Sequence, residues 1–392
     1  MHQKQTEIWH SIIIGAGASG LFCAGSFAAP KLVLEHNDRA GKKLSVTGGG
    51  KCNFTNLFVS SNDYISSQKH FCKNALAAFR PEHFTRLLTQ EKIPFYEKEK
   101  GQLFTHDAKE IVRLLEKRAK KQNTTFSYNT QVLAIEKEKD FFKVQTSKGI
   151  FLAYHVIIAS GAISYPALGA SGFAFQTAQS LGINVIPIRP ALVGLRLAEP
   201  YKSICRSLAG NSLNVTIKTS IRTEDGQLLF THDGISGPAV LQSSLFWNEG
   251  EKISINFIPQ INVLEFLKSN KNKKETLSKI LSPYISAKIA KLFLAEIDVP
   301  ACNASKEILI QAATRLNKFE CVPTGTAGYT KAEVTAGGID PRSVDSHSMQ
   351  SKNIEGLFII GEALDVTGRV GGFNLHWAWA SAHLCAQHLC KS

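Results

Sequence analysis

The chain has 392 residues, of which 44% are hydrophobic and 20% are charged. These proportions are ordinary for a globular protein and exclude a disordered chain, a fibre and a small disulfide-stapled scaffold. The formal net charge of +13 fits either a polyanionic partner, such as nucleic acid, or a bound anionic cofactor in a protein whose remaining charge serves solubility.

The first predicted elements form a βαβ unit. An apolar run at 11–14 stops at glycine, which is the pattern of a buried parallel strand. The sequence Gly-Ala-Gly-Ala-Ser-Gly follows at 15–20, then a helix of small residues at 21–29 and a second strand at 31–35.

This unit carries a dinucleotide-binding fingerprint. Gly15 permits the tight turn, Gly17 lets a pyrophosphate approach the backbone, and Gly20 lets helix and strand pack closely. Unpaired N–H groups at the helix N-terminus favour the phosphates. Glu35 ends the second strand, where it can bind ribose hydroxyls and disfavours a 2′-phosphate. The alternative is a glycine turn that binds nothing, but the preceding strand and following helix favour the dinucleotide.

The next part of the chain alternates loops, helices and strands. We predict a glycine-rich basic loop at 39–56, helices near 73–90 and 108–121, a hairpin-like stretch at 126–147, and a buried strand at 156–159 that leads into 160–162.

From about residue 190 the pattern becomes that of an antiparallel region. Strands are predicted at 193–197, 213–218, 228–230 and 253–257, and Lys-rich helical patterns follow at 261–320. After 326 the glycine-rich α/β pattern returns, with a strand at 356–360 and a last helix at 373–390.

The predicted fold class is therefore α/β, with a split Rossmann-like dinucleotide-binding domain and an inserted α+β region. The first part of the dinucleotide-binding domain covers 1–190 and the second part covers 326–392. The insert covers 191–325, with a β-rich portion at 191–260 and a helical portion at 261–325.

Two features favour FAD over NAD as the bound dinucleotide. A second glycine-rich loop at 48–53 can approach a large cofactor closely, and the strand that ends in Gly361 and Glu362 resembles the place where two-domain flavoproteins hold the ribityl chain. No second G-x-G-x-x-G occurs, so NAD(P)H would reach the flavin only transiently, as a reductant.

Several motifs in order carry a resemblance to a known family. They are Gly41 to Leu44, Gly48 to Asn56, Ser164 to Pro166, Phe230 to Pro238, Thr335 to Gly338, Gly361 to Asp365 and Gly371 to Ala378. With these the chain resembles the BaiN/RdsA family of FAD-dependent oxidoreductases, also known as aminoacetone oxidase-like flavoproteins. The resemblance runs from Gly15 to the last helix.

The resemblance implies a split FAD-binding domain and an insert built from a β half-barrel and a small helical subdomain. It also implies FAD as the cofactor. Activities in the family include reduction of carbon–carbon double bonds in enone-like substrates, formation of dihydrouridine in large-subunit ribosomal RNA, and amine oxidation.

This chain departs from the family pattern at three places. Lys51 replaces the usual Arg, His376 stands where Gln is common, and the loop at 169–175 loses an acid and a glycine. We expect that loop to border the cofactor or the substrate.

The residues expected to bind FAD lie on the glycine turns and at the strand ends. They are Gly15, Ala16, Gly17, Ala18, Ser19, Gly20, Glu35, His36, Lys42, Lys43, Gly48, Gly49, Gly50, Cys52, Asn53, Val132, Ser160, Gly161, Gly361, Glu362, Asp365, Gly371, Gly372, Phe373, Asn374 and Leu375.

Three residues are candidates for catalysis. Cys52 is either a proton donor beside the flavin or a small buried residue, since an ordinary thiol is protonated at neutral pH. His232 either faces the flavin or binds phosphate, or it is an ordinary turn residue. His376 either donates a proton at the edge of the cofactor or packs in the core.

We therefore expect an FAD-dependent oxidoreductase that reduces a uridine C5–C6 double bond in 23S ribosomal RNA to dihydrouridine with NAD(P)H as electron source. The alternative is a small-molecule flavin oxidase or enone reductase acting on an amine or steroid-like substrate. A third hypothesis is an FAD-bearing RNA-binding or redox-sensing protein without turnover.

Two basic runs bear on the choice of partner. Arg113, Lys117, Arg118, Lys120 and Lys121 form one, and Lys268, Lys271, Lys273 and Lys274 form the other. Each is either a solvated helix face or part of an RNA track.

The eight cysteines are scattered and contain no C-x-x-C pair, so no zinc ribbon is indicated. The cluster at 383–390 cannot direct four ligands to one point from a single helix, and no metal is expected. The chain shows no apolar run long enough for a signal peptide or a membrane span, so we expect a cytoplasmic protein without a membrane partner.

Overall fold

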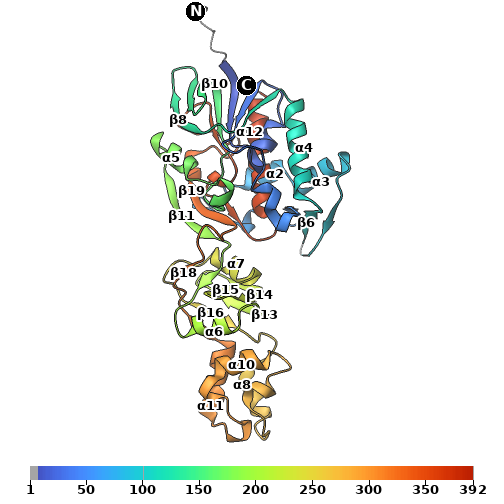
Figure 1. The fold of residues 1–392 in the computed structure, drawn as a ribbon, viewed down its shortest axis with the longest axis vertical. Helices are drawn as coiled ribbons and strands as arrows, with labels where there is room; N and C mark the ends of the chain where they lie inside the picture. Colours follow the sequence, from blue (N-terminus) through green and yellow to red (C-terminus); the bar gives the residue numbers. More distant parts are fainter. Residues whose placement is uncertain (1–7, 100, 392) are drawn as a thin grey trace, which may run out of the picture. The chain divides into compact units, whose positions relative to one another are not determined.

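A computed structural model describes residues 8–99 and 101–391. The described chain forms two compact units (Figure 1). Unit 1 takes the chain up to Arg189 and again from Val334, and unit 2 takes Pro190–Glu333. The chain returns to unit 1 later than position 326, because β18 (Gly325–Thr326) pairs with β12 (Leu195–Arg196) inside unit 2.

The centre of unit 1 is a parallel sheet, which confirms the predicted α/β class. Its strands stand in the order β7-β2-β1-β10, with β20 on the other side of β10. Each of these neighbours is parallel. Their bounds are β1 (Ile8–Ile14), β2 (Lys31–Leu34), β7 (Thr124–Ser127), β10 (Gly149–Ile158) and β20 (Leu357–Ile359).

The sheet continues past β10 as an antiparallel hairpin. β9 (Phe142–Thr146) pairs with β10, and β8 (Val132–Lys137) pairs with β9. The predicted hairpin at 126–147 is thus wrong at its start, because residues up to Ser127 belong to the parallel strand β7. Alternation of apolar and polar residues marks a strand but does not specify its partner.

One helix of unit 1 is enclosed by protein on nearly every side. α12 (Phe373–Leu389) packs against α1 (Ala18–Ala24), α2 (Lys73–Ala78) and β3 (Asn53–Asn56), and its two tryptophans are buried. A helix that is apolar all round needs such a place. The indole Nε1 of Trp379 donates to the carbonyl of Phe54 at 2.8 Å, so its buried polar group is satisfied.

The other elements of unit 1 surround this core. The helical pattern at 73–90 is two helices, because Pro81 forces the preceding Arg80 into extended backbone. The elements are β4 (Tyr64–Ile65), α3 (Pro81–Gln90), β5 (Phe95–Glu97), β6 (Gln102–Thr105), α4 (Ala108–Lys121), α5 (Phe173–Ser180), β11 (Val185–Ala191), β19 (Val334–Ile339) and β21 (Thr367–Gly368), with short 3-10 helices at Leu44–Gly50 (η1), Ser61–Asp63, Pro166–Leu168, Pro341–Ser343 and Gly361–Ala363.

Unit 2 has its own hydrophobic core and its own sheet. The sheet is antiparallel, in the order β17-β16-β13-β14-β15-β12-β18. Besides β12 and β18 its elements are α6 (Tyr201–Ser207), β13 (Ser212–Lys218), β14 (Thr223–Phe230), β15 (Gly234–Ser236), α7 (Pro238–Ser244), β16 (Ile253–Asn256), α8 (Val263–Ser269), α9 (Leu277–Ile280), α10 (Ala287–Leu294), α11 (Lys306–Asn317) and β17 (Phe319–Cys321), with 3-10 turns at Ala295–Ile297 and Ala301–Asn303.

Among the described residues, no helix combines the length and the apolar character that crossing a membrane requires.

The packing of α1 on β1 gives a test of the fold. A Cβ on Gly20 would lie 2.0 Å from the carbonyl oxygen of Gly15. This oxygen belongs to the backbone and cannot move aside as the end of a flexible side chain can. We expect Gly20→Ala to lower the free energy of unfolding by about 1–3 kcal/mol, measured by urea denaturation of the apoprotein. Gly17→Ala is the matched control, since a Cβ there meets nothing within 4 Å. Equal stability of the two variants would contradict the close approach.

Candidate functional site

The candidate site lies at the carboxyl edge of the parallel sheet. Ile14, Ile158 and Ile359 stand opposite one another in the register of β1, β10 and β20, so the three following turns leave the sheet at the same level. Chain order reverses between β1 and β10. In open α/β sheets, ligands bind outside the carboxyl ends of the strands at such a switch point.

The glycine turn after β1 is pressed against the turn after β10. Gly15 has φ +105°, and a Cβ on it would lie 2.7 Å from the carbonyl oxygen of Ala159. Gly17 differs from Gly15 and Gly20 because a Cβ there meets nothing within 4 Å. Of the three fingerprint glycines, Gly17 is therefore the one that faces open space. It precedes the first turn of α1 (Ala18–Ala24), where Ala18 and Ser19 present backbone N–H groups.

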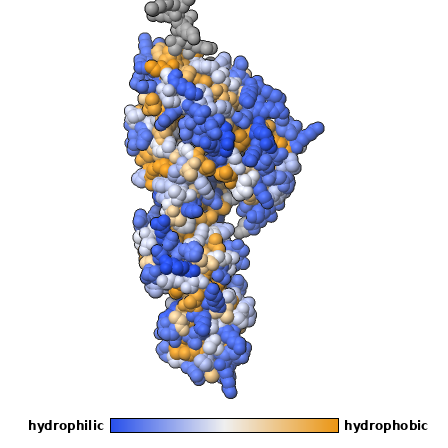
Figure 2. All heavy atoms as spheres, in the orientation of Figure 1, coloured by the Kyte–Doolittle hydropathy of each residue, from blue (hydrophilic) through white to orange (hydrophobic). Residues whose placement is uncertain are grey.

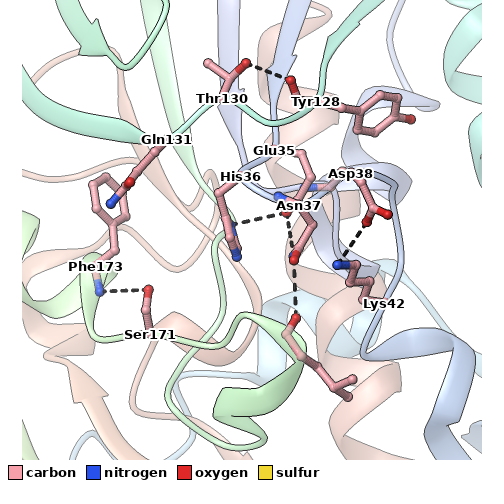
Figure 3. A network of polar contacts seen from close by, with 12 residues as sticks. Glu35, His36, Asn37, Asp38, Lys42, Tyr128, Thr130, Gln131, Ser171 and Phe173 are labelled. Carbon is pink, nitrogen blue, oxygen red and sulfur yellow. Dashed lines mark hydrogen bonds and ion pairs between the residues drawn. The ribbon is translucent and has the colours of Figure 1, made fainter.

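Glu35 ties the end of β2 to this turn, and Figure 3 shows the side chains of His36 and Asn37 beside it. Its Oε2 accepts the N–H of Ala16 at 2.8 Å, and its Oε1 accepts the backbone and amide N–H groups of Asn37 at 2.9 and 2.8 Å. Nδ1 of His36 lies 3.2 Å from the same Oε1. Each carboxylate oxygen has about two acceptor positions, so Oε2, which accepts one bond among the described residues, has a position left for a ribose hydroxyl.

Two further segments surround Glu35. The carbonyl of Glu35 accepts the N–H of Thr130 at 2.9 Å, two residues before Val132 begins β8. A Cβ on Gly169 would lie 2.3 Å from Nε2 of His36, so the altered 169–175 loop begins against this turn. Lys42 forms an ion pair with Asp38 at 2.9 Å (Figure 3).

Ser160 carries one of the buried polar atoms that have no partner among the described residues, and it is the one beside the glycine turn. Its Oγ is buried and has no hydrogen-bond partner among the described residues. Its Cα would lie 2.8 Å from a Cβ on Gly15, so it adjoins the glycine turn. Buried polar groups are nearly always paired, and an orphaned hydroxyl at this edge indicates that a ligand contributes the missing bond.

Buried side chains of α12 hold the turn after β20 in place. Gly361 donates its N–H to Oγ of Ser381 and accepts the indole N–H of Trp377, both at 3.0 Å. It has φ +71°, and a Cβ on it would lie 2.6 Å from Oγ of Ser19. The burial of α12 thus positions the next residue, Glu362.

Glu362 carries charge at the open edge. Its Oε2 accepts a 2.8 Å hydrogen bond from Nζ of Lys43, and its Oε1 accepts the N–H of Thr335 at 3.1 Å. A Cβ on Gly161 would lie 4.0 Å from the same Oε2. Lys43 also lies over the ring of Tyr165, 5.9 Å from its centroid. Thr335 and Tyr165 lie within family motifs, but the sequence did not predict their contacts with Lys43 and Glu362.

The second glycine-rich loop forms η1 (Leu44–Gly50) and the start of β3. Gly48, Gly49 and Gly50 all have positive φ, and Cβ atoms on Gly49 and Gly50 would meet nothing within 4 Å. Cys52 follows with φ +51° and a fully buried side chain. Burial raises the pKa of its thiol to about 12, although a hydrogen bond with Thr47 opposes the shift. The thiol therefore keeps its proton at neutral pH.

The turn before α12 packs closely on β3. Gly371 and Gly372 have positive φ, and a Cβ on Gly372 would lie 2.4 Å from the carbonyl oxygen of Thr55; Asn53, at the start of β3, lies against the same turn. The Asn374 amide accepts the N–H of Gly368 at 2.8 Å and donates to its carbonyl at 2.9 Å. Asn374 thus shapes the turn, while the first-turn N–H groups of Phe373, Asn374 and Leu375 have no helical acceptor.

His376 is a core residue, which argues against its candidate catalytic role. Its ring is fully buried. Nδ1 lies 2.7 Å from the hydroxyl of Thr55 and Nε2 lies 3.0 Å from the carbonyl of Phe79. Only a protonated Nε2 can donate to a carbonyl, so in the neutral ring Nδ1 accepts from the hydroxyl of Thr55. Burial lowers the pKa of His376 to about 4.

Two other candidates have surroundings that the structure shows directly. The Asp365 carboxylate is buried and accepts the N–H of Ser67 at 2.8 Å, so it holds the chain beside β4. His232 is exposed in the turn between β14 and β15 of unit 2, where the N–H of Thr231 donates to the carbonyl of Gly234.

No group of three His, Cys, Asp or Glu side chains is placed to hold a metal ion within 8–99 and 101–391. In the cluster near the C-terminus, Cys385 is buried and Cys390 is exposed.

Comparisons with known proteins agree with the fold. The family model described as "HI0933-like protein Rossmann domain" matches residues 9–388. The chain is 38% identical to a protein of Escherichia coli named "Ribosomal RNA dihydrouridine synthase", over 98% of both chains. It is 39% identical to a protein of the same name from Haemophilus influenzae, over 97% of this chain and 98% of the relative. It is 28% identical to the "3-dehydro-bile acid delta(4,6)-reductase" of Clostridium scindens, over 96% of this chain and 97% of the relative.

The buried ring of His376 predicts a pH dependence of stability. Its folded pKa of about 4 lies below the ordinary value of about 6.5, so the unfolded chain takes up a proton first as the pH falls. Stability is therefore lost between about pH 6.5 and 4. Relative to His376→Gln, the wild type should lose about 2 kcal/mol between pH 7.5 and 5 in urea denaturation. A difference that does not change with pH would contradict the assignment.

Proposed function

The chain belongs to the HI0933-like Rossmann-domain family, and on that premise we propose that it is an FAD-dependent oxidoreductase that reduces the C5–C6 double bond of a uridine in 23S ribosomal RNA to dihydrouridine. The observation that carries the substrate is the 38–39% identity, over nearly the whole chain, to two proteins named for this activity. The full-length match also confirms the resemblance found in the motifs.

The open edge of the sheet fits FAD. The space at Gly17 accommodates a pyrophosphate in front of α1. The unpartnered hydroxyl of Ser160 provides a hydrogen bond to it. Glu35 provides acceptors for the adenosine ribose, and Glu362 with Lys43 provides an acceptor and a donor for the ribityl chain. The open Gly49 and Gly50 and the first-turn N–H groups of α12 border the flavin ring.

FAD, when bound, supplies the hydride that reduces the double bond, after NAD(P)H has reduced the flavin. The protein provides placement and one proton. Cys52 is enclosed and His376 uses both ring nitrogens within the core, so neither is placed to deliver that proton. Of the three sequence candidates, His232 is the one whose ring is exposed, and its role stays a prediction from the sequence.

A small-molecule reductase is the second candidate function. The 28% identity to a bile-acid reductase favours it, because that match also spans nearly the whole of both chains. It is the weaker candidate, because the two relatives named for rRNA are closer in sequence.

The space in front of Gly17 gives a test of cofactor binding. A methyl group there protrudes into the place proposed for the pyrophosphate without touching protein. We expect Gly17→Ala to bind FAD at least about tenfold more weakly, measured by titrating the apoprotein with FAD, while urea denaturation of the apoprotein is unchanged. FAD binding as tight as in wild type would place the pyrophosphate elsewhere.

The substrate is tested on RNA. Deletion of the gene should remove one dihydrouridine from large-subunit rRNA, and the wild-type gene should restore it, whereas the FAD-deficient Gly17→Ala gene should restore less. Purified reduced enzyme should form the same dihydrouridine in an rRNA transcript. An unchanged dihydrouridine map, together with turnover of enones by the purified enzyme, would reject rRNA in favour of the small-molecule function.

A further inference from the structure

The outer face of α4 is strongly basic. Arg113, Lys117, Lys120 and Lys121, with Glu116, line an open groove of about 570 Å³, named the α4 groove below. All four basic side chains are exposed. Their spacing of four, three and one residues places them on one face of the helix, over about 12 Å of its length. In Figure 2 hydrophilic side chains cover this side of unit 1.

The fold itself does not account for this face. α4 is held to unit 1 by its opposite face, where Ile111, Leu114 and Leu115 are buried. Cations in the last turn favour the helix dipole, which accounts for Lys120 and Lys121. It does not account for cations further back in the helix, where like charges at four-residue spacing repel each other.

Nearby carboxylates neutralise the α4 groove only in part. Lys117 pairs with Glu91 at 2.8 Å and Arg113 with Asp107 at 3.6 Å, and exposed pairs of this kind are weak. Glu116 accepts the hydroxyl of Tyr128 at 2.8 Å. Within the part of the chain that the structure describes, no carboxylate lies within ion-pair distance of Lys120 or Lys121.

Arg118, on the same helix, serves as an internal contrast. Its guanidinium is half-buried and donates to the carbonyl of Gly25 at 3.5 Å, and burial lowers its pKa. It therefore joins α4 to the turn after α1, whereas the four cations of the α4 groove face solvent.

The helix that carries the α4 groove also supports the candidate site. The inner side of α4 packs on η1, the base of the second glycine-rich loop. A Cβ on Gly41, at the entrance to that loop, would lie 2.7 Å from Cγ2 of Val112. A polyanion held on the outer side of α4 would thus be fixed to the same helix that supports the loop proposed to border the flavin.

We propose that the α4 groove binds the phosphate backbone of the RNA substrate and holds it while the target uridine reaches the flavin. This rests on the proposed function. RNA fits better than an anionic membrane, because a membrane-binding helix also inserts an exposed apolar face, and the apolar face of α4 is buried. Phosphate contacts need only cations, and they position the nucleic acid without reading its sequence.

The test is a variant with all four cations neutralised: Arg113→Gln, Lys117→Gln, Lys120→Gln and Lys121→Gln. We expect it to raise the KM for an rRNA transcript at least about tenfold in the FAD-loaded enzyme. The dependence of log K on log salt should become shallower by about 0.7 for each phosphate of a single strand that the variant no longer neutralises. The rate of flavin reduction by NAD(P)H should not change.

A second variant controls for net charge. It removes four exposed lysines scattered over both units: Lys139→Gln, Lys218→Gln, Lys288→Gln and Lys318→Gln. The proposal is supported if this control keeps the wild-type KM and salt slope while the α4 variant does not. Equal changes in both variants would show that the effect comes from the overall charge, and this result would overturn the proposal.

Two further outcomes separate the possibilities. Filter binding measures affinity for the transcript independently of turnover. If the wild-type enzyme binds RNA through the α4 groove but forms no dihydrouridine, the proposed function is rejected and the binding proposal stands. Sedimentation with phosphatidylserine vesicles tests the membrane. Weaker vesicle binding by the α4 variant, with RNA affinity unchanged, would overturn the assignment to RNA.

Discussion

The site depends on direct contact between backbone segments at the carboxyl edge of one sheet. Gly15 meets the backbone after β10, Gly20 meets the carbonyl of Gly15, and Gly361 meets Ser19, each at distances that exclude a Cβ. These contacts bring three turns from distant parts of the sequence to one level. The space at Gly17 stands out against them, since the other two fingerprint glycines, Gly15 and Gly20, are closely packed.

Most polar side chains near this edge serve to build it. The carboxylate of Glu35 satisfies N–H groups of Ala16 and Asn37, and the amide of Asn374 closes the turn at Gly368. Once these bonds are made, the hydroxyl of Ser160 remains without a partner among the described residues. A ligand site is recognised here less by which polar residues are present than by which of them the fold leaves unsatisfied.

The same organisation explains how one family serves different substrates. The relatives that span nearly the whole chain are named for a ribosomal RNA and for a bile acid, and the chain itself matches one Rossmann-domain family model over almost its full length. In the proposed function the open edge of the sheet holds the cofactor, whereas the proposed contact with RNA lies on an exposed surface, the α4 groove. Such surfaces vary without cost to the core, because exposed side chains contribute little to packing.

The sequence alone determined the βαβ unit, the central strands, helix α4 and helix α12, because each has a local signature: an apolar run that stops at glycine, or an amphipathic or fully apolar helical period. It also indicated the family, because the order of the motifs along the chain can be recognised without the three-dimensional structure. Only the tertiary structure decided that residues 124–127 join the parallel sheet and that His376 is a neutral core residue. It likewise decided that Asn374 and Asp365 support turns. Strand pairing, burial and hydrogen-bond partners depend on residues far away in the chain, and no local pattern records them.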